Sequence, residues 1–216
     1  MAHEQISLTG YRFSVYTRSV RLVLFEKGLD CAYSEVDPFD PGDAARLSDL
    51  HPFRRVPIVT HAGRSFYETT AILRYLDAAF PDPPLTPVST LAAARMQQVI
   101  GIVDSYAYPV LIRNVFSNAV FRPLQGLSGD PAALRDGLSE SCAVLRALDD
   151  IAAEGEVLNR RFVTLADFHL IPMIDYFRLV PEGAALLADQ PALSAWWNGV
   201  KGRPSTIVTR PDLNAV

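Results

Sequence analysis

Two short patterns in this sequence combine residue types that could bind a small charged ligand. The first is Arg55-Val56-Pro57-Ile58-Val59, and the second starts eleven residues after Pro57 with Glu68-Thr69. A proline beside a buried strand cannot join the hydrogen-bond ladder, so Pro57 must lie at a strand start or in a special turn. Glu68 and Thr69 stand where an apolar helical pattern begins, and the free backbone N–H groups there favour anions. The two patterns together predict a site for a ligand that carries an amine and carboxylates.

The elements that must position these patterns lie in the first 80 residues, where strand and helix patterns alternate. Alternating or apolar runs predict strands over residues 6–9, 31–36, 58–60 and 65–67, the last two forming a hairpin around a compact turn. Helical spacing predicts helices over residues 20–27, 41–50 and 72–80, and Gly28 and Pro81 end the first and the last. This order predicts a mixed sheet covered by helices.

Residues 81–88 are predicted to be a proline-rich linker, because four prolines between Pro81 and Pro87 make the chain stiff and extended. The patterns after the linker are helical throughout. A long helix is expected from about Thr90 towards Phe121, with a kink at Pro109, where the proline removes a backbone donor. Further helices are predicted to begin at Asp130-Pro131, at a capping box from Thr164 to Asp167, and at Pro191.

The composition excludes several classes of protein. The 216 residues are 49% hydrophobic and 20% charged, which is ordinary for a folded soluble protein. A formal charge of −4 argues against a general nucleic-acid binder. No apolar run approaches the roughly 20 residues that cross a bilayer, and the first residues show no signal-peptide pattern. Cys31 and Cys142 suit neither a disulfide framework nor a metal site, so we expect reduced core cysteines in a cytoplasmic protein without a metal.

With these elements in place, the chain resembles the soluble glutathione transferases over nearly its full length. Residues 14–29 resemble the first-helix signature of that family, and residues 51–57 resemble its asparagine-proline-x-x-lysine-valine-proline stretch. Glu68-Thr69 is similar to the family's glutamate-serine pair, and residues 164–167 match the capping box of its helical domain. Each match is weak alone, but four matches in the right order and spacing, on both sides of the linker, are specific.

The resemblance implies an α+β, thioredoxin-like domain in residues 1–80, with the element order βαβαββα and a mixed sheet, followed by an all-α domain in residues 89–216. It also implies a homodimer, a site for glutathione as co-substrate in the first domain, and a variable apolar pocket between the two domains. Pro57 is expected to be cis, as in the family. The Val56 backbone N–H and C=O would then pair with the cysteinyl part of glutathione.

Ser14 is the residue that the resemblance assigns to catalysis, as a hydrogen-bond donor that holds glutathione as a thiolate. A thiol of pKa about 8.5 is only a few per cent ionised at pH 7, and lowering that pKa by roughly two units takes about 2.7 kcal/mol. A hydroxyl that donates to a charged partner supplies about 1.5–3 kcal/mol, and the helix start adds about 0.3–1 kcal/mol. Tyr11 and Tyr16 are alternative donors. Without the resemblance, the position of Ser14 would indicate only a residue that caps the helix.

The binding residues follow from the same resemblance. The Glu68 carboxylate would meet the ammonium group of the γ-glutamyl end, and the Thr69 hydroxyl and N–H would meet its α-carboxylate. Arg55 stands where the family has lysine, and its guanidinium can grip the glycyl carboxylate with two bonds, with Arg54 as the alternative. His51 replaces the family's asparagine and is expected to cap locally.

The helical domain supplies further candidates. Asp104 is a candidate for reaching the glutathione ammonium of the partner subunit, as an acid does in some classes, and a solvated helix face is the alternative. Aromatic residues that could line the pocket for the second substrate are Phe13, Tyr16, Tyr106, Tyr108 and Phe116. An aromatic stripe at helical spacing is more often part of a core.

The function that these features favour is conjugation of the glutathione thiolate to small hydrophobic electrophiles. A glutathione-dependent isomerase, dehalogenase or peroxidase on the same fold is the first alternative, because the pocket and not the fold sets the substrate. A non-catalytic protein that binds glutathione or another ligand is the second. A redox thiol-transfer enzyme is disfavoured, since position 14 holds no cysteine and the chain has no C-x-x-C.

Overall fold

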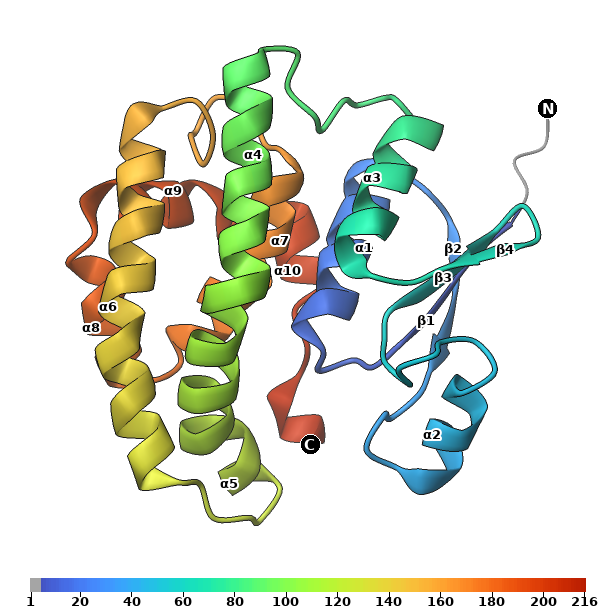
Figure 1. The fold of residues 1–216 in the computed structure, drawn as a ribbon, viewed down its shortest axis with the longest axis horizontal. Coiled ribbons are helices and arrows are strands. Elements are labelled where there is room, and N and C mark those ends of the chain that lie inside the picture. Colours follow the sequence, from blue (N-terminus) through green and yellow to red (C-terminus); the bar gives the residue numbers. More distant parts are fainter. Residues whose placement is uncertain (1–4) are drawn as a thin grey trace. The chain divides into compact units, whose positions relative to one another are not determined.

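The computed structural model describes residues 5–216, which fold into two compact units (Figure 1). The first unit ends at Pro84 and the second runs from Leu85 to Val216. The division falls within residues 81–88, the stretch expected to be a linker. The Asp82–Pro83 peptide bond in this stretch is cis, which the sequence analysis did not anticipate.

The first unit is built on a four-stranded mixed sheet, as expected. Its strands are β1 (Ile6–Gly10), β2 (Cys31–Glu35), β3 (Ile58–His61) and β4 (Arg64–Phe66), in the spatial order β2-β1-β3-β4. β1 pairs in parallel with β2, while β3 pairs antiparallel with both β1 and β4. The two central strands supply buried apolar residues, because both faces of the sheet's middle are covered; these are Ile6, Leu8, Ile58 and Val59.

Three helices complete the first unit, α1 (Val15–Glu26), α2 (Pro41–Leu47) and α3 (Thr69–Ala79). The resulting order βαβαββα confirms the thioredoxin-like, α+β interpretation. α1 and α3 pack against each other and bury an apolar stripe, as amphipathic helices on a sheet do. The buried residues of that stripe include Val20, Val23, Ile72, Leu73 and Leu76.

A buried lysine joins the ends of these two helices. Lys27, the C-cap residue of α1, donates from Nζ to Asp77 Oδ1 of α3 at 2.8 Å. The same ammonium donates to the carbonyls of Phe80 at 2.7 Å and Pro83 at 2.9 Å. A buried charge is tolerated only where it is paired and hydrogen-bonded, and all three Nζ–H groups have an acceptor here. Lys27 therefore ties α1 to α3 and to the segment that leaves the unit.

The second unit is helical in every regular element that the structure describes, which confirms the all-α expectation. Its elements are α4 (Thr90–Ile102), the π-helical segment η1 (Val103–Phe121), α5 (Arg122–Leu124), α6 (Pro131–Glu154), α7 (Leu165–Phe177), α8 (Pro181–Ala188), α9 (Pro191–Val200), α10 (Pro204–Val208) and the short 3₁₀ turn η2 (Leu213–Ala215). Pro109, the expected kink site, lies inside η1. The sequence analysis did not predict α8 and α10.

The predicted capping box opens α7, the most buried helix of this unit. Asp167 Oδ2 accepts hydrogen bonds from the Thr164 N–H at 2.7 Å and the Thr164 hydroxyl at 2.8 Å. Its other oxygen accepts from Trp196 Nε1 of α9 at 2.7 Å. Burial raises the pKa of the Asp167 carboxyl, and these donors oppose that shift. Asp167 is therefore a structural residue, as the capping pattern indicates.

Among residues 5–216, one helical stretch has the length and composition of a membrane span. The stretch Thr90–Leu124 is long enough and apolar enough to cross a bilayer. This corrects the expectation that no apolar run approaches the length of a membrane span. Half of its most apolar window is buried inside the protein, as in the core helix of a globular unit. Length and composition are weak grounds for a span when the apolar residues already pack against other helices.

Candidate functional site

The sheet register brings the predicted site residues of the first unit to one end of the sheet. β1 and β3 run antiparallel with Thr9 opposite Ile58, so Pro57 lies next to the end of β1, which Ser14 follows by a few residues. Phe66 of β4 lies opposite Val59, and Glu68 follows two residues later. Three segments that are far apart in the sequence thus converge because two antiparallel pairings share β3.

Ser14 is the N-cap residue of α1. Its backbone is extended, with φ −72° and ψ 123°, and its Oγ accepts a hydrogen bond from the Thr17 N–H at 3.2 Å. The residue is half-buried. A hydroxyl that accepts a bond still has its own proton to donate, so Ser14 can cap the helix and serve a second acceptor at once. The cap interpretation and the donor interpretation are therefore compatible.

Thr17 positions the turn that carries Ser14, a role that sequence reasoning missed. Its Oγ1 accepts from the Tyr11 N–H at 3.3 Å, while its own N–H donates to Ser14. A Cβ on Gly10 would lie 2.3 Å from Thr17 Cγ2, so only glycine allows this approach. A glycine at a strand end was the available signal, since it often marks a close contact.

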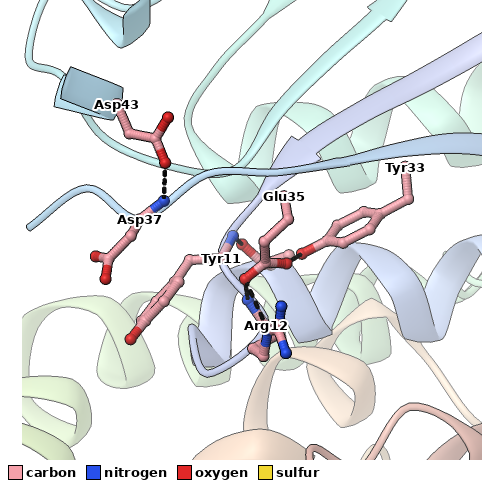
Figure 2. Close-up of polar contacts among 7 residues, drawn as sticks. Tyr11, Arg12, Tyr33, Glu35, Asp37 and Asp43 are labelled. Carbon is pink, nitrogen blue, oxygen red and sulfur yellow. Dashed lines mark hydrogen bonds and ion pairs between the residues drawn. The ribbon is translucent and has the colours of Figure 1, made fainter. Parts of the chain in front are cut away.

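Tyr11, the alternative donor, lies in a negative electrostatic environment (Figure 2). Burial raises the pKa of the Tyr11 phenol to about 12, Asp37 and Glu35 add to that shift, and Arg12 opposes it. Glu35 is held in place, because its Oε1 accepts from Arg12 N at 3.0 Å and Arg12 Nε at 3.1 Å. The negative charges that oppose a phenolate also oppose a thiolate placed beside Tyr11.

The other aromatic candidates near the start of α1 are half-buried. The Phe13 ring meets that of Tyr11 edge to face at 5.4 Å between centroids. Tyr11 also meets Phe39 at 6.1 Å, and Phe39 is 78% exposed. Tyr16 lies in the first turn of α1. The donor role of Tyr16 and the pocket role of both Phe13 and Tyr16 stay predictions.

The segment before β3 contains the bond conformation that was expected there. The Val56–Pro57 peptide bond is cis, as predicted. Val56 is half-buried and packs on a small cluster formed by Val36, Leu47 and Ile58. These apolar contacts hold the Val56 side chain in place, and the backbone of the loop is fixed with it. Arg54 and Arg55 are exposed, and Arg54 has a left-handed φ of 52°.

Glu68 and Thr69 form the start of α3, as predicted, with a backbone that sequence reasoning missed. Glu68 is the N-cap residue at φ 68° and ψ 112°, and its side chain makes no capping hydrogen bond. A non-glycine residue in this region costs about 1–3 kcal/mol and often marks a functional site. Glu68 is exposed, while Thr69 is buried.

His51 contacts both segments of the site. Its Nδ1 accepts from the Phe53 N–H at 3.1 Å, which agrees with the expected local cap. Its ring lies against that of Tyr67, the residue before Glu68, with 4.6 Å between the centroids. Burial lowers the pKa of His51, with Glu68 opposing and Arg55 reinforcing that shift. His51 thus feels the charges of the expected partners of both ends of the ligand.

The candidates in the second unit have different surroundings. Asp104 Oδ1 lies 2.8 Å from Nε2 of the buried His169, and the Asp104 side chain is 41% exposed. Tyr106 is exposed, and Phe116 is buried and stacked on Tyr176 at 4.0 Å. Stacking within the helical unit is the behaviour of a core residue. The roles of Asp104 at a partner's site and of Tyr106 and Phe116 in a pocket stay predictions.

The cysteines differ from the expectation in their burial. Both are free, but Cys31 and Cys142 are half-buried and not core residues. Burial raises the pKa of the Cys31 thiol to about 11, which keeps it protonated at neutral pH. Within residues 5–216, no three His, Cys, Asp or Glu side chains gather in a way that could hold a metal ion.

Comparisons with known proteins agree with this geometry. A family model described as "Glutathione S-transferase, N-terminal domain" matches residues 8–84. Glutathione S-transferase F6 of Arabidopsis thaliana is 26% identical over 204 residues, covering 93% of this chain and 96% of the relative. Glutathione S-transferase 3 of Zea mays is 28% identical over 208 residues, which cover 93% of this chain and 90% of the relative. A solved structure described as glutathione S-transferase III in apo form has a TM-score of 0.81 at 26% identity, with 95% of each chain covered.

Proposed function

We propose that this chain, which belongs to the soluble glutathione transferase superfamily, conjugates the thiolate of glutathione to small hydrophobic electrophiles. The observation that carries the proposal is the convergence of Ser14, the cis-Pro57 loop and Glu68 at one end of the sheet. The full-length likeness to proteins named glutathione S-transferase supports the same activity. Glutathione is a co-substrate in this proposal, and the chemistry requires no metal.

Binding uses the charges at both ends of the site. The exposed Glu68 carboxylate meets the ammonium group of the γ-glutamyl end, and the start of α3 at Thr69 receives its α-carboxylate. The Val56 backbone pairs with the cysteinyl residue. Arg55, or Arg54 beside it, takes the glycyl carboxylate through two hydrogen bonds. These contacts fix the tripeptide so that its sulfur points towards the start of α1.

Ser14 stabilises the thiolate in this proposal and does not act as a nucleophile. Its hydroxyl proton is available because Oγ only accepts from Thr17. Donation to a charged sulfur contributes about 1.5–3 kcal/mol, and the N-terminus of α1 adds about 0.3–1 kcal/mol. Together these lower the thiol pKa by roughly two units, which makes much of the bound thiol ionised at neutral pH. The nucleophile is then the ligand's own sulfur, held beside the second substrate.

The local electrostatics favour Ser14 over Tyr11 as the principal donor. Asp37 and Glu35 both oppose a negative charge near Tyr11, whereas Ser14 caps a helix start, which favours one. Tyr16 stays an alternative. Phe13, Tyr16, Tyr106 and Phe116 remain our candidates for contacts with the second substrate.

The proposal includes a homodimer in the cytoplasm, as the resemblance implies, with Asp104 as a candidate contact to the glutathione of the partner subunit. Sedimentation measures the assembly directly. If Asp104 acts in this way, Asp104→Asn weakens glutathione binding in the dimer. A variant that binds as tightly as the wild type assigns Asp104 to contacts within its own chain, such as the one with His169.

A panel of electrophiles tests the activity. Purified protein is assayed with a chlorodinitroarene, a hydroperoxide and a maleyl compound, each with and without glutathione. Glutathione-dependent consumption of the chlorodinitroarene supports transferase chemistry, whereas turnover of only the hydroperoxide or the maleyl compound favours a peroxidase or an isomerase. Calorimetry with millimolar glutathione separates these outcomes from a non-binding protein, because absence of heat from a folded sample contradicts the whole proposal.

A further inference from the structure

His51 connects three parts of the glutathione-binding region through contacts of three kinds. Its backbone N–H donates to the Leu47 carbonyl at the end of α2 at 2.8 Å, and its carbonyl accepts from Arg54 at 2.9 Å. Its Nδ1 accepts from the Phe53 N–H, and its ring lies against Tyr67. The residue is only 3% exposed, so these contacts fix the imidazole in one position.

The hydrogen bond from Phe53 sets the protonation state of this imidazole. A backbone N–H always donates, so Nδ1 must carry a lone pair, and the neutral ring holds its proton on Nε2. Protonation of Nδ1 would place two donors 3.1 Å apart in a partly buried location. The ring or the loop must then move, and either movement shifts the segment that continues through Arg54 and Arg55 to Pro57.

The charged neighbours give protonation a second effect. Glu68 follows Tyr67, whose ring lies against His51. The Glu68 carboxylate raises the pKa of the imidazole, and the Arg55 guanidinium lowers it. An imidazolium attracts the Glu68 carboxylate, which then competes with the ammonium of the ligand. It also repels the guanidinium of Arg55. Both changes weaken the two charged ends of the proposed glutathione site.

We propose that His51 is a positioning residue that shapes the glutathione site only while its imidazole is neutral, so that acidification weakens glutathione binding through this side chain. The inference rests on the proposed function. Burial holds the pKa of His51 below its usual value near 6.5, so the neutral form dominates at neutral pH and is lost on acidification. Because the neutral form of His51 supports binding, the affinity for glutathione is highest at pH values above the pKa of His51. It falls as the pH drops below that pKa.

The test measures the affinity for S-methylglutathione by calorimetry between about pH 7.5 and about pH 5. This probe has no thiol, so ionisation of the sulfur cannot affect the result. The wild type is expected to bind roughly fivefold more weakly at the acidic end, the effect of losing about one hydrogen bond. In His51→Asn the amide oxygen can accept from the Phe53 N–H without titrating, so the affinity should be nearly constant over the range.

A second histidine in the same unit provides the matched control. His61 Nδ1 lies 2.7 Å from the Tyr75 hydroxyl in the β3–α3 region, and His61→Asn is expected to keep the pH profile of the wild type. A wild-type profile without acid weakening overturns the inference, as does a His51→Asn profile that falls as steeply as the wild type. Acid weakening that disappears only in His61→Asn assigns the effect to the wrong histidine and also overturns it.

Nuclear magnetic resonance of the unliganded protein tests the inference separately from glutathione binding. The imidazole of His51 should carry its proton on Nε2 at neutral pH and titrate below 6.5, with the Phe53 amide signal moving at the same midpoint. A proton on Nδ1 at neutral pH overturns the inference. If S-methylglutathione does not bind at neutral pH while this titration is observed, the proposed function has failed but the coupling of His51 to its loop has not.

Discussion

Ser14 Oγ accepts a hydrogen bond from the Thr17 N–H at 3.2 Å, so the candidate catalytic hydroxyl is also the cap of α1. The two roles use different parts of the same group, a lone pair for the cap and a proton for the thiolate. A substitution that removes the Ser14 hydroxyl therefore changes helix stability and thiolate stabilisation together. An experiment on this residue must separate the two effects.

We expect Ser14→Ala to lower the turnover of a chlorodinitroarene about 10²-fold, the scale of losing one preorganised donor, with little change in glutathione affinity. Steady-state kinetics and the pH dependence of thiolate absorbance measure the loss. Ser14→Thr keeps both the cap and the hydroxyl and should retain most of the activity. Full activity in Ser14→Ala would move the donor role to Tyr11 or Tyr16.

Ser89→Ala is the matched control for the lost cap. Ser89 caps α4 and accepts from the Ala92 N–H at 3.4 Å, so its removal costs about 1 kcal/mol of folding free energy, as for Ser14. Denaturant unfolding should show similar losses for the two alanine variants. Only Ser14→Ala should lose turnover. An equal loss of turnover in Ser14→Ala and Ser89→Ala would mean that the loss comes from lower stability and not from the missing donor.

Glu68 combines an expected binding role with a costly backbone, and substitutions should separate the two. Glu68→Ala removes the carboxylate and should weaken retention on immobilised glutathione, while the alanine keeps the unfavourable φ of 68°. Glu68→Gly should weaken retention to the same extent yet raise the unfolding free energy by about 1 kcal/mol over Glu68→Ala, because glycine adopts this φ freely. Unchanged retention in both variants would mean that the ammonium site is assigned wrongly.

Lys27→Met is expected to destabilise the protein by about 3–5 kcal/mol, because it leaves the Asp77 carboxylate and two carbonyls buried without their cation. Urea unfolding monitored by tryptophan fluorescence and far-UV circular dichroism measures the change. Arg46→Met is the comparison, since its ion pair with Asp43 is exposed and should contribute less than about 1 kcal/mol. Equal effects would show that the Lys27 cluster contributes no more than a surface pair.

Tyr11→Phe should retain turnover within about threefold of the wild type, because the negative charges at Asp37 and Glu35 disfavour a thiolate beside this phenol. The same kinetic assay applies, and near-UV circular dichroism checks that the aromatic contact with Phe13 persists. A loss that exceeds the loss in Ser14→Ala would make Tyr11 the principal donor.

Several features of this protein follow from the sequence because they depend on neighbouring residues. The order of strands and helices comes from local periodicity, and the cap at Thr164 and Asp167 comes from two residues three positions apart. The start of α3 at Glu68 was predicted from the apolar helical pattern that begins there. Local signals of this kind are unaffected by the rest of the fold. The cis peptide at Pro57 was implied by the family resemblance and not by a local pattern.

Other features appear only in the tertiary structure because they join residues that the sequence separates. The contact between Lys27 and Asp77 spans 50 positions, and both are ordinary surface residue types in the sequence. The sequence predicts a local cap at His51 but not its ring against Tyr67, since that contact needs the register of β3 with β4. Strand pairing and side-chain packing bring such residues together, and the burial that they produce lowers the pKa of His51.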